Sequence, residues 1–125
     1  MTVLVDTSVI IDYLRGDQGA ERILESERLV GPLHASEITR LEVLAGMRAN
    51  EEDSTRSLLS IFIWHPVDTV TAERAGELGR RWLRSHQTID SADLAIAATA
   101  MVTGCELLTC NVKHFPMFAD LRKPY

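Results

Sequence analysis

Residues 2–16 read TVLVDTSVIIDYLRG, and the prediction of the fold depends on the pattern in this stretch. The apolar, β-branched run TVLV predicts a short buried strand over 2–5, which ends at Asp6. Thr7 or Ser8 can cap the helix that follows, over about 8–15, and Gly16 ends that helix. The stretch therefore predicts a strand, an acidic residue and a helix in immediate succession.

The rest of the chain continues this alternation. Further strands are predicted over 33–35, 61–64 and 106–109, and further helices over 18–29, 36–50, 51–61, 70–85 and 90–103. Short apolar strands that alternate with helices favour an α/β fold with a mostly parallel sheet covered on both faces. Because no repeat, low-complexity segment or linker interrupts the pattern, we expect one domain over residues 1–125.

The composition narrows the class of function. A net charge of −5 argues against a sequence-blind nucleic-acid coat protein, which needs many Lys and Arg contacts to phosphate. The same charge is compatible with a nuclease, whose centre is acidic, and it would suit a basic protein partner.

The chain lacks the marks of membrane insertion and of secretion. It has no run of 18 apolar residues and no basic region before an apolar stretch at its start, so we expect neither a transmembrane helix nor a signal peptide. Cys105 and Cys110 are too few for a disulfide framework. These features predict two buried thiols in a cytoplasmic protein.

One acidic residue interrupts the apolar stripe of the helix predicted over 36–50. Ile38, Leu41 and Ala45 follow helical spacing and are predicted to face inward. Glu42 occupies the remaining position of that stripe, whereas the nearby arginines at 40 and 48 lie off it. The pattern therefore predicts a carboxylate on a buried face.

The helix predicted over 90–103 repeats this feature in the sequence IDSADLAIAATA at 89–100. Asp93 shares a face with Ile89 and Ile96, and Asp90 lies one turn earlier. A simpler interpretation stays open, in which Asp90 caps the helix and Asp93 completes a capping box.

These acids point to a divalent cation. Asp6 and Asn111 each follow a predicted strand, and ligand sites in parallel sheets lie beyond the carboxyl ends of the strands. Carboxylates packed together repel one another unless a cation intervenes. Hard carboxylate oxygens favour Mg²⁺ or Mn²⁺, and the histidines show no zinc-binding spacing. Such a site suits phosphodiester hydrolysis by a metal-activated water.

Four segments carry a resemblance to a known family: LVDTSVIIDYLRG at 4–16, SEITRLEVLAGMR at 36–48, DSADLAIAATA at 90–100 and LLTCNVKHF at 107–115. In order and spacing they resemble the PIN-domain ribonucleases, and in particular the VapC-type toxins of bacterial toxin–antitoxin modules. The resemblance covers nearly the whole chain. It implies a three-layer α/β/α sandwich with a short, mostly parallel central sheet, and a Mg²⁺- or Mn²⁺-dependent endoribonuclease.

The resemblance also implies the site residues. Asp6, Glu42 and Asp93 match the three acids of the family. Asn111 departs from the pattern, because many relatives carry a fourth acid there and an asparagine brings no charge. Asp90 could supply part of that charge, so we keep Asp90 and Asn111 as candidate metal ligands.

The threonines at 7 and 109 and the serine at 8 are expected near the site, where they could bind ligand or substrate. His114 stands where an acid is common in relatives. By resemblance, the expected partners are structured RNA such as tRNA or rRNA, a small basic antitoxin and a second copy of the chain. Arg80, Arg81 and Arg84 could contact RNA, although such a run is more often a solvated helix face.

Two other functions remain open. A catalytically silent PIN module would bind RNA or a partner without cleavage, and Asn111 lends that reading some weight. A receiver-like phosphoacceptor domain also carries acids beyond its first strand. It requires an acidic pair there, whereas this chain has Asp6 alone.

Overall fold

The computed structural model describes residues 2–125 and confirms the α/β prediction. Its strands are β1 (Val3–Val5), β2 (Leu33–Ser36), β3 (Phe62–His65) and β4 (Glu106–Leu108). Its α-helices are α1 (Thr7–Leu14), α2 (Gln18–Val30), α3 (Glu37–Ala45), α4 (Glu52–Leu59), α5 (Thr69–Trp82) and α6 (Ser91–Thr103). Two short 3₁₀ helices are η1 (Ala49–Glu51) and η2 (Val112–His114).

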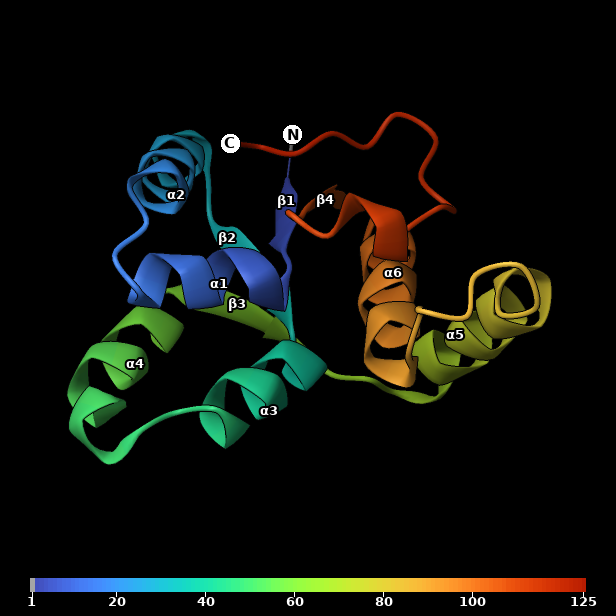
Figure 1. Cartoon of the computed structure of the whole chain (residues 1–125), viewed down its shortest axis with the longest axis horizontal. Helices are drawn as coiled ribbons and strands as arrows, with labels where there is room; N and C mark the ends of the chain where they lie inside the picture. The colour runs from blue at the N-terminus through green and yellow to red at the C-terminus, as the bar shows by residue number, and fades with distance from the viewer. Residues whose placement is uncertain (1) are drawn as a thin grey trace.

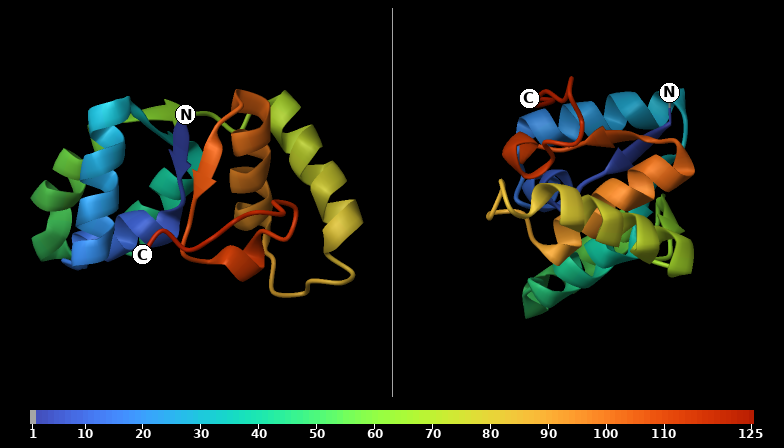
Figure 2. Two further views of the ribbon diagram at one scale, coloured as in Figure 1. Left: turned by 90° about the horizontal axis from the view of Figure 1, so that it is seen from above. Right: turned by 90° about the vertical axis from the view of Figure 1, so that its right-hand side faces the viewer.

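The four strands form one sheet in the order β3-β2-β1-β4, and every neighbouring pair is parallel. Val3 of β1 pairs with Leu33 on one side and with Glu106 on the other. Seen from above, β1 and β4 lie side by side and point the same way (Figure 2). The carboxyl ends of all four strands therefore meet at one edge, where the sequence predicted the site.

Helices cover both faces of the sheet, as expected for a three-layer α/β/α sandwich (Figure 1). Successive residues of β1 point to opposite faces because the side-chain period of a strand is two. Val3 and Val5 belong to the apolar cluster beneath α1, α2 and α4. Leu4 belongs to the second cluster, beneath α5 and α6. One strand of three residues thus contributes to both halves of the core.

The apolar helix α6 lies inside the molecule, as its sequence predicted. Every residue from Asp93 to Ala100 is buried, because the sheet, α5 and α3 surround the helix. A helix that is apolar on all sides is stable only in such a position. Gly104 ends it with a φ of 70°, a left-handed conformation that glycine adopts without strain.

Most boundaries differ from the predictions by one to three residues, and one boundary and one helix face differ more. Helix α3 ends at Ala45 rather than near 50, because Gly46 stops it and η1 and α4 follow. Strand β3 begins and ends one residue later than predicted.

The predicted inward stripe of α3 is wrong. Leu41 is 60% exposed and Ala45 is exposed as well, whereas Thr39 and Val43 are buried. Helix α3 leaves β2 through its N-cap Ser36 and packs against α1, so Thr39 lies opposite Thr7. Packing against a neighbouring helix, and not hydrophobicity alone, set the rotation of α3.

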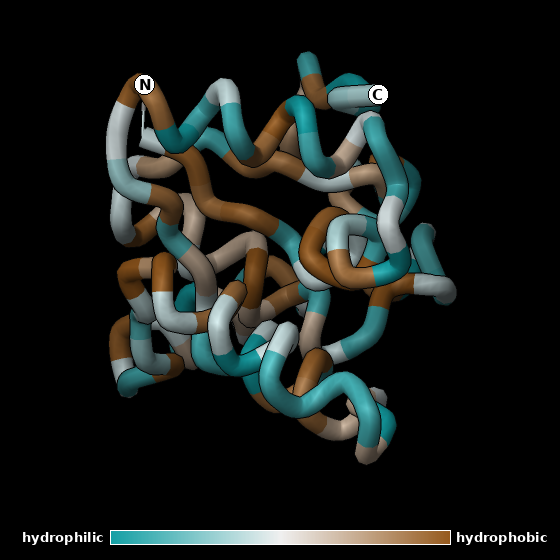
Figure 3. Tube along the Cα trace, turned by 90° about the vertical axis from the view of Figure 1, so that its left-hand side faces the viewer, coloured by the Kyte–Doolittle hydropathy of each residue, from teal (hydrophilic) through white to brown (hydrophobic). Residues whose placement is uncertain are grey.

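The surface keeps several large apolar side chains. The hydropathy-coloured trace shows hydrophobic strand segments inside and hydrophilic stretches along outer turns (Figure 3). Leu29 and Val70 are nonetheless 90% and 62% exposed. Cys105 and Cys110 are free and half-buried, so the prediction of fully buried thiols is wrong. Within residues 2–125, no helix is long and apolar enough to cross a membrane.

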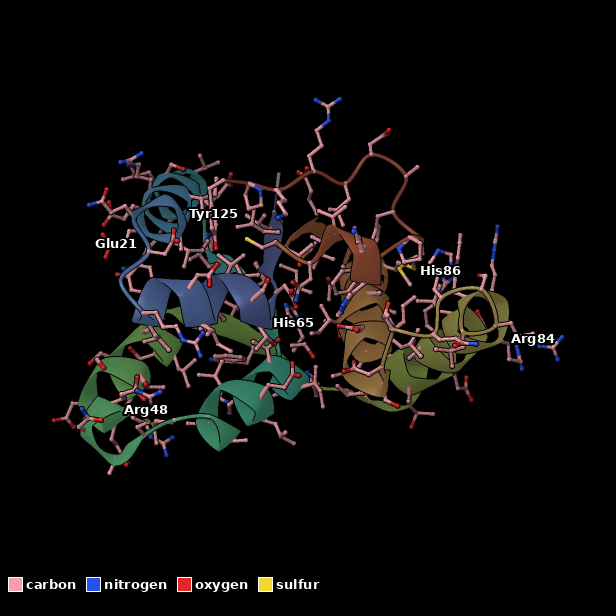
Figure 4. The ribbon with its side chains drawn as sticks, viewed as in Figure 1. Glu21, Arg48, His65, Arg84, His86 and Tyr125 are labelled. Carbon is pink, nitrogen blue, oxygen red and sulfur yellow. The ribbon has the colours of Figure 1, made fainter. Side chains whose placement is uncertain are left out.

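The C-terminal residue is held against the first two helices. The hydroxyl of Tyr125 donates a hydrogen bond of 2.6 Å to the Asp12 carboxylate of α1. Its ring lies beside α2 (Figure 4). A Cβ atom built on Gly19 of α2 would lie 2.8 Å from Cβ and Cγ of Tyr125. This contact leaves no room for a larger residue at position 19.

We expect Gly19→Ala to lower the free energy of unfolding by about 1 kcal/mol, because the new methyl group overlaps Tyr125. Alanine is otherwise the better helix former, by up to about 1 kcal/mol. The same change in a Tyr125→Gly background is therefore expected to stabilise the protein. Urea unfolding of the two single variants and the double variant measures this coupling.

Gly76→Ala in α5 provides a matched control, because nothing lies within 4 Å of a Cβ at that position. It should stabilise both the wild type and the Tyr125→Gly variant. If Gly19→Ala behaves like Gly76→Ala while Tyr125 is present, the close contact between α2 and the C-terminus is not formed in solution.

Candidate functional site

Asp6 lies at the carboxyl end of β1 in a network of hydroxyl groups. Its backbone N–H donates to the Leu108 carbonyl of β4, which places Asp6 against the end of the neighbouring strand. The hydroxyls of Thr109 and Ser8 donate to its Oδ2 at 2.6 and 2.8 Å. Asp6 is only 3% exposed. Two charge-assisted hydrogen bonds compensate the burial of this carboxylate.

The same hydroxyls fix the segment after β4. The backbone N–H of Asn111 donates to Thr109 Oγ1 at 2.9 Å, and that of Cys110 donates to Ser8 Oγ at 3.2 Å. Thr109 thus accepts from Asn111 while it donates to Asp6. The end of β1 and the loop after β4 are held as one unit.

Glu42 is attached to this unit through the residue that follows Asp6. The hydroxyl of Thr7 donates to Glu42 Oε1 at 2.7 Å, and the buried Thr39 hydroxyl lies 3.0 Å from Thr7 Oγ1. Arg40 pairs with Glu37 and not with Glu42. The second predicted acid is therefore hydrogen-bonded to the residue that follows the first, although Leu41 and Ala45 of the stripe used to predict its inward position are exposed.

Asp90 and Asp93 form a reciprocal pair at the start of α6. Asp90 Oδ1 accepts from the Asp93 backbone N–H at 2.8 Å, and Asp93 Oδ2 accepts from the Asp90 N–H at 3.2 Å. The simpler interpretation of Asp90 as a helix cap with a capping box is confirmed. Asp93 is nonetheless buried, and its Oδ2 lies 3.0 Å from Nδ1 of His114.

The environment of Asp93 favours its neutral form when no cation is bound. The pKa of Asp93 is raised from 3.8 to about 6, and burial is the main cause. The negative charges of Asp90 and Asp6 contribute to this rise, whereas the hydrogen bond from the Asp90 N–H and the nearby His114 limit it. The influence of Asp6 on Asp93 indicates that the two carboxylates lie within electrostatic range of each other.

Asp6, Glu42 and Asp93 share one geometric property. Each uses a single carboxylate oxygen for its partners, which leaves Asp6 Oδ1, Glu42 Oε2 and Asp93 Oδ1 without a hydrogen bond from residues 2–125. Among those residues, no fully buried side-chain oxygen or nitrogen lacks a partner. The three free oxygens therefore reach solvent and are open to an external ligand.

The acids form an open arrangement rather than a closed cage. In the described part of the chain, no three His, Cys, Asp or Glu side chains come together as a ready metal-binding group. Asn111 is exposed and is tied in through its backbone only. The structure thus connects Glu42 to Thr7, holds Asp93 with Asp90 and His114, and leaves the Asn111 side chain without a hydrogen bond from residues 2–125.

The contacts of Thr109 and His114 could not be read from the sequence. Thr109 was expected near the site, where it could hydrogen-bond ligands or substrate, and it donates a hydrogen bond to the candidate ligand Asp6. The position of Thr109 at the end of the strand predicted over 106–109 was the available signal. His114 had no predicted role, because its contact with Asp93 depends on how η2 packs against α6.

A histidine pair lies on β2 and β3. Nδ1 of His34 is 2.7 Å from Nε2 of His65, and the rings are stacked. Burial, and then the nearby His65, lower the pKa of His34. Spacing along the chain gave no sign of this pair, since parallel pairing of the two strands creates it.

We expect Thr109→Val to lower the free energy of unfolding by about 1–2 kcal/mol. The change removes a donor to Asp6 and leaves the Asn111 N–H without its acceptor. Thr109→Val keeps the side-chain volume and removes only the hydroxyl, whereas Thr109→Ser keeps the hydroxyl and removes the methyl group. If the valine and serine variants unfold at the same urea concentration, the hydroxyl does not hold the strand ends together.

The raised pKa of Asp93 predicts a pH-dependent effect of Asp93→Asn in EDTA. Because the pKa of Asp93 is higher in the folded state, protonated Asp93 favours folding. Its contribution to the stability of the wild type is full below about pH 4 and is lost as pH rises through about 6. The asparagine variant, which never carries this charge, should therefore match the wild type near pH 4. Above about pH 6 it should be more stable by up to about 3 kcal/mol, because each unit of difference between the folded and unfolded pKa is worth about 1.4 kcal/mol.

Urea unfolding between about pH 4 and pH 8 measures this difference. Asp90→Asn serves as the control, because asparagine caps helices as well as aspartate does and Asp90 is exposed. An Asp93→Asn variant that is less stable than the wild type throughout this range would contradict the prediction.

Comparison with known proteins assigns the family. The model of the PIN domain matches residues 3–121. Ribonuclease VapC19 of Mycobacterium tuberculosis is 43% identical over 123 residues, which are 98% of each chain. Ribonuclease VapC10 of the same organism is 44% identical over 98% of this chain and 92% of its own. The toxin–antitoxin complex from Klebsiella pneumoniae contains a chain that is 31% identical, with a TM-score of 0.83 over 99% of this chain and 98% of that one. The chain therefore belongs to the PIN-domain family, among the ribonucleases of the VapC type.

Proposed function

We propose that this chain is a Mg²⁺- or Mn²⁺-dependent endoribonuclease that acts as the toxin of a VapBC-type toxin–antitoxin pair. One observation carries the proposal. Asp6 follows β1, Glu42 is hydrogen-bonded to Thr7, and Asp93 lies in the first turn of α6, and each of these carboxylates keeps one oxygen without a hydrogen bond from residues 2–125. The curated relatives VapC19 and VapC10, both ribonucleases, support the reaction class.

The donor set suits a small hard cation. Carboxylate oxygens from Asp6, Glu42 and Asp93 are the ligands that Mg²⁺ and Mn²⁺ prefer, and Mg²⁺ keeps several waters beside one or two carboxylates. An open arrangement is therefore compatible with this metal. A bound ion would supply an activated water for attack on a phosphodiester. Asp90 and Asn111 are the additional candidate ligands.

The residues around the acids would hold them in position. Thr109 and Ser8 keep Asp6 in one orientation, and Thr7 does the same for Glu42, so neither acid has to reorganise when ligand arrives. His114 contacts Asp93, so a cation that takes up Asp93 competes with this histidine.

The substrate class and the partners complete the proposal. We infer cleavage of structured RNA, tRNA or rRNA, and inhibition by a small basic antitoxin, which the charge of −5 would attract. The Klebsiella pneumoniae relative is itself a toxin–antitoxin complex. Exposed apolar residues such as Leu41 and Val70 would suit contacts with the antitoxin or a second copy of the chain. Action on RNA would take place in the cytoplasm.

The purified chain is expected to cleave structured RNA with Mg²⁺ or Mn²⁺ and to lose cleavage in EDTA. Asp6→Asn, Glu42→Gln and Asp93→Asn should each lower the rate at least about 100-fold, because each removes a charged ligand while keeping the shape of the side chain. Gel analysis of RNA fragments measures the rates, and calorimetry measures Mg²⁺ binding.

Asp17→Asn is the matched control, because Asp17 caps α2 away from the acids and asparagine caps equally well. It should cleave at the wild-type rate. Cleavage that persists in EDTA, or at full rate in the Asp6 or Asp93 variant, would contradict the proposal. Tight RNA binding without cleavage in Mg²⁺ would instead support a silent PIN module.

A further inference from the structure

An open pocket of about 460 Å³ lies between the segment that precedes Asp90 and the segment that follows Asn111. We refer to it as the loop pocket, and its walls come from the loop between α5 and α6 and from the region of η2. The lining residues are Ser85, His86, Gln87, Thr88, Val112, Lys113 and Pro116. Its volume falls within the range of small-molecule sites and is sufficient for a nucleotide.

Both walls of the loop pocket continue directly into the candidate active site. Thr88 precedes Asp90 by two residues, and Lys113 lies between Asn111 and His114. The contact between His114 and Asp93 holds η2 against α6 next to the pocket. A group bound in the loop pocket would therefore be adjacent to a phosphodiester placed at the acids.

The charge of the loop pocket is opposite to that of the acids. No Asp or Glu lines it, and within residues 2–125 neither Lys113 nor His86 forms an ion pair with a carboxylate. Arg84 lies with His86 at the end of α5, on the opposite side of the molecule from Arg48 (Figure 4). On a chain of charge −5, this is a surface that a phosphate group can approach.

One wall of the loop pocket is already ordered. The ring of His86 packs edge-on against Trp82 at 5.5 Å, and its Nδ1 lies 2.7 Å from the Ser85 hydroxyl. An imidazole held in this way can stack on an unpaired base without first losing side-chain freedom. Gln87 and Thr88 add hydrogen-bonding groups, and Val112 and Pro116 add apolar surface.

We propose that the loop pocket binds the nucleotide of a single-stranded RNA segment next to the scissile phosphodiester. Lys113 contacts a phosphate of that segment, and His86 stacks on its base. The inference rests on the proposed ribonuclease function and adds a substrate-binding site to it. It also separates the residues that select and position RNA from the acids that serve the reaction.

Binding of a fluorescein-labelled single-stranded RNA of mixed sequence tests the proposal. Fluorescence anisotropy is measured with the full chain in EDTA, so no metal-dependent cleavage intervenes, over a range of KCl concentrations. Lys113→Ala is expected to weaken binding about 10-fold and to reduce the slope of log K against log salt by about 0.7, the effect of one lost phosphate contact. Lys113→Arg should restore the slope.

His86→Ala should weaken binding about 10-fold without changing the salt slope, because stacking on a base releases no counterions. Lys123→Ala is the matched control, since it removes one lysine charge outside the loop pocket. The thermal unfolding temperature of each variant checks that the fold is retained. The proposal would be overturned if Lys113→Ala and Lys123→Ala weakened RNA binding equally. It would also be overturned if neither Lys113→Ala nor His86→Ala weakened RNA binding.

Cleavage in Mg²⁺ separates this inference from the proposed function. If the wild type cleaves RNA but the pocket variants keep its KM, the loop pocket is not a substrate site and the ribonuclease function still stands. If the wild type binds RNA through the loop pocket but never cleaves it, the loop pocket is an RNA-binding site and the proposed ribonuclease function is wrong. Pocket variants that bind RNA normally but lose a protein inhibitor would assign the pocket to a protein partner and overturn the proposal.

Discussion

The hydrogen bond from Thr109 to Asp6 is the interaction on which the site depends. It joins the carboxyl ends of β1 and β4, two strands that lie about a hundred residues apart in sequence. A buried carboxylate without such donors would be too costly to keep ionised. Because Thr109 also accepts the Asn111 N–H, the loop after β4 and the first acid move as one. Thr7 extends this unit to Glu42 in α3.

The carboxylates of Asp6 and Asp93 differ in how far their partners offset the free-energy cost of burying a negative charge. Asp6 receives two hydroxyl donors, whereas Asp93 remains partly uncompensated despite its contact with His114. A buried carboxylate that lacks enough hydrogen-bond donors or cations lowers the stability of the folded state at neutral pH. A cation that binds the free oxygens of the acids would relieve their mutual repulsion. The arrangement is therefore one that favours ligand binding over the stability of the empty fold.

Some sequence predictions were correct for the stated reason, and others were correct for another reason. The burial of α6 followed from its apolar sequence, and Gly104 ends the helix as predicted. Glu42 was expected near the site because it interrupts a stripe with Leu41, yet Leu41 is exposed. The structure connects Glu42 to Thr7, the residue after Asp6, where Thr7 and Thr39 pack α1 against α3. Hydrophobic periodicity identifies that a helix has an inner face, but a polar contact between helices can rotate it.

The sequence by itself determined the order of the elements and which residue follows each strand. A strand is recognised from local side-chain pattern, and the carboxyl end of a parallel strand is a fixed location, so Asp6 could be assigned to the edge of the sheet. Only the tertiary structure decided which oxygen of each acid is occupied, that His114 contacts Asp93, and that the loop before α6 and η2 enclose a pocket. These properties arise from contacts between side chains far apart in the chain, and no local pattern encodes such contacts.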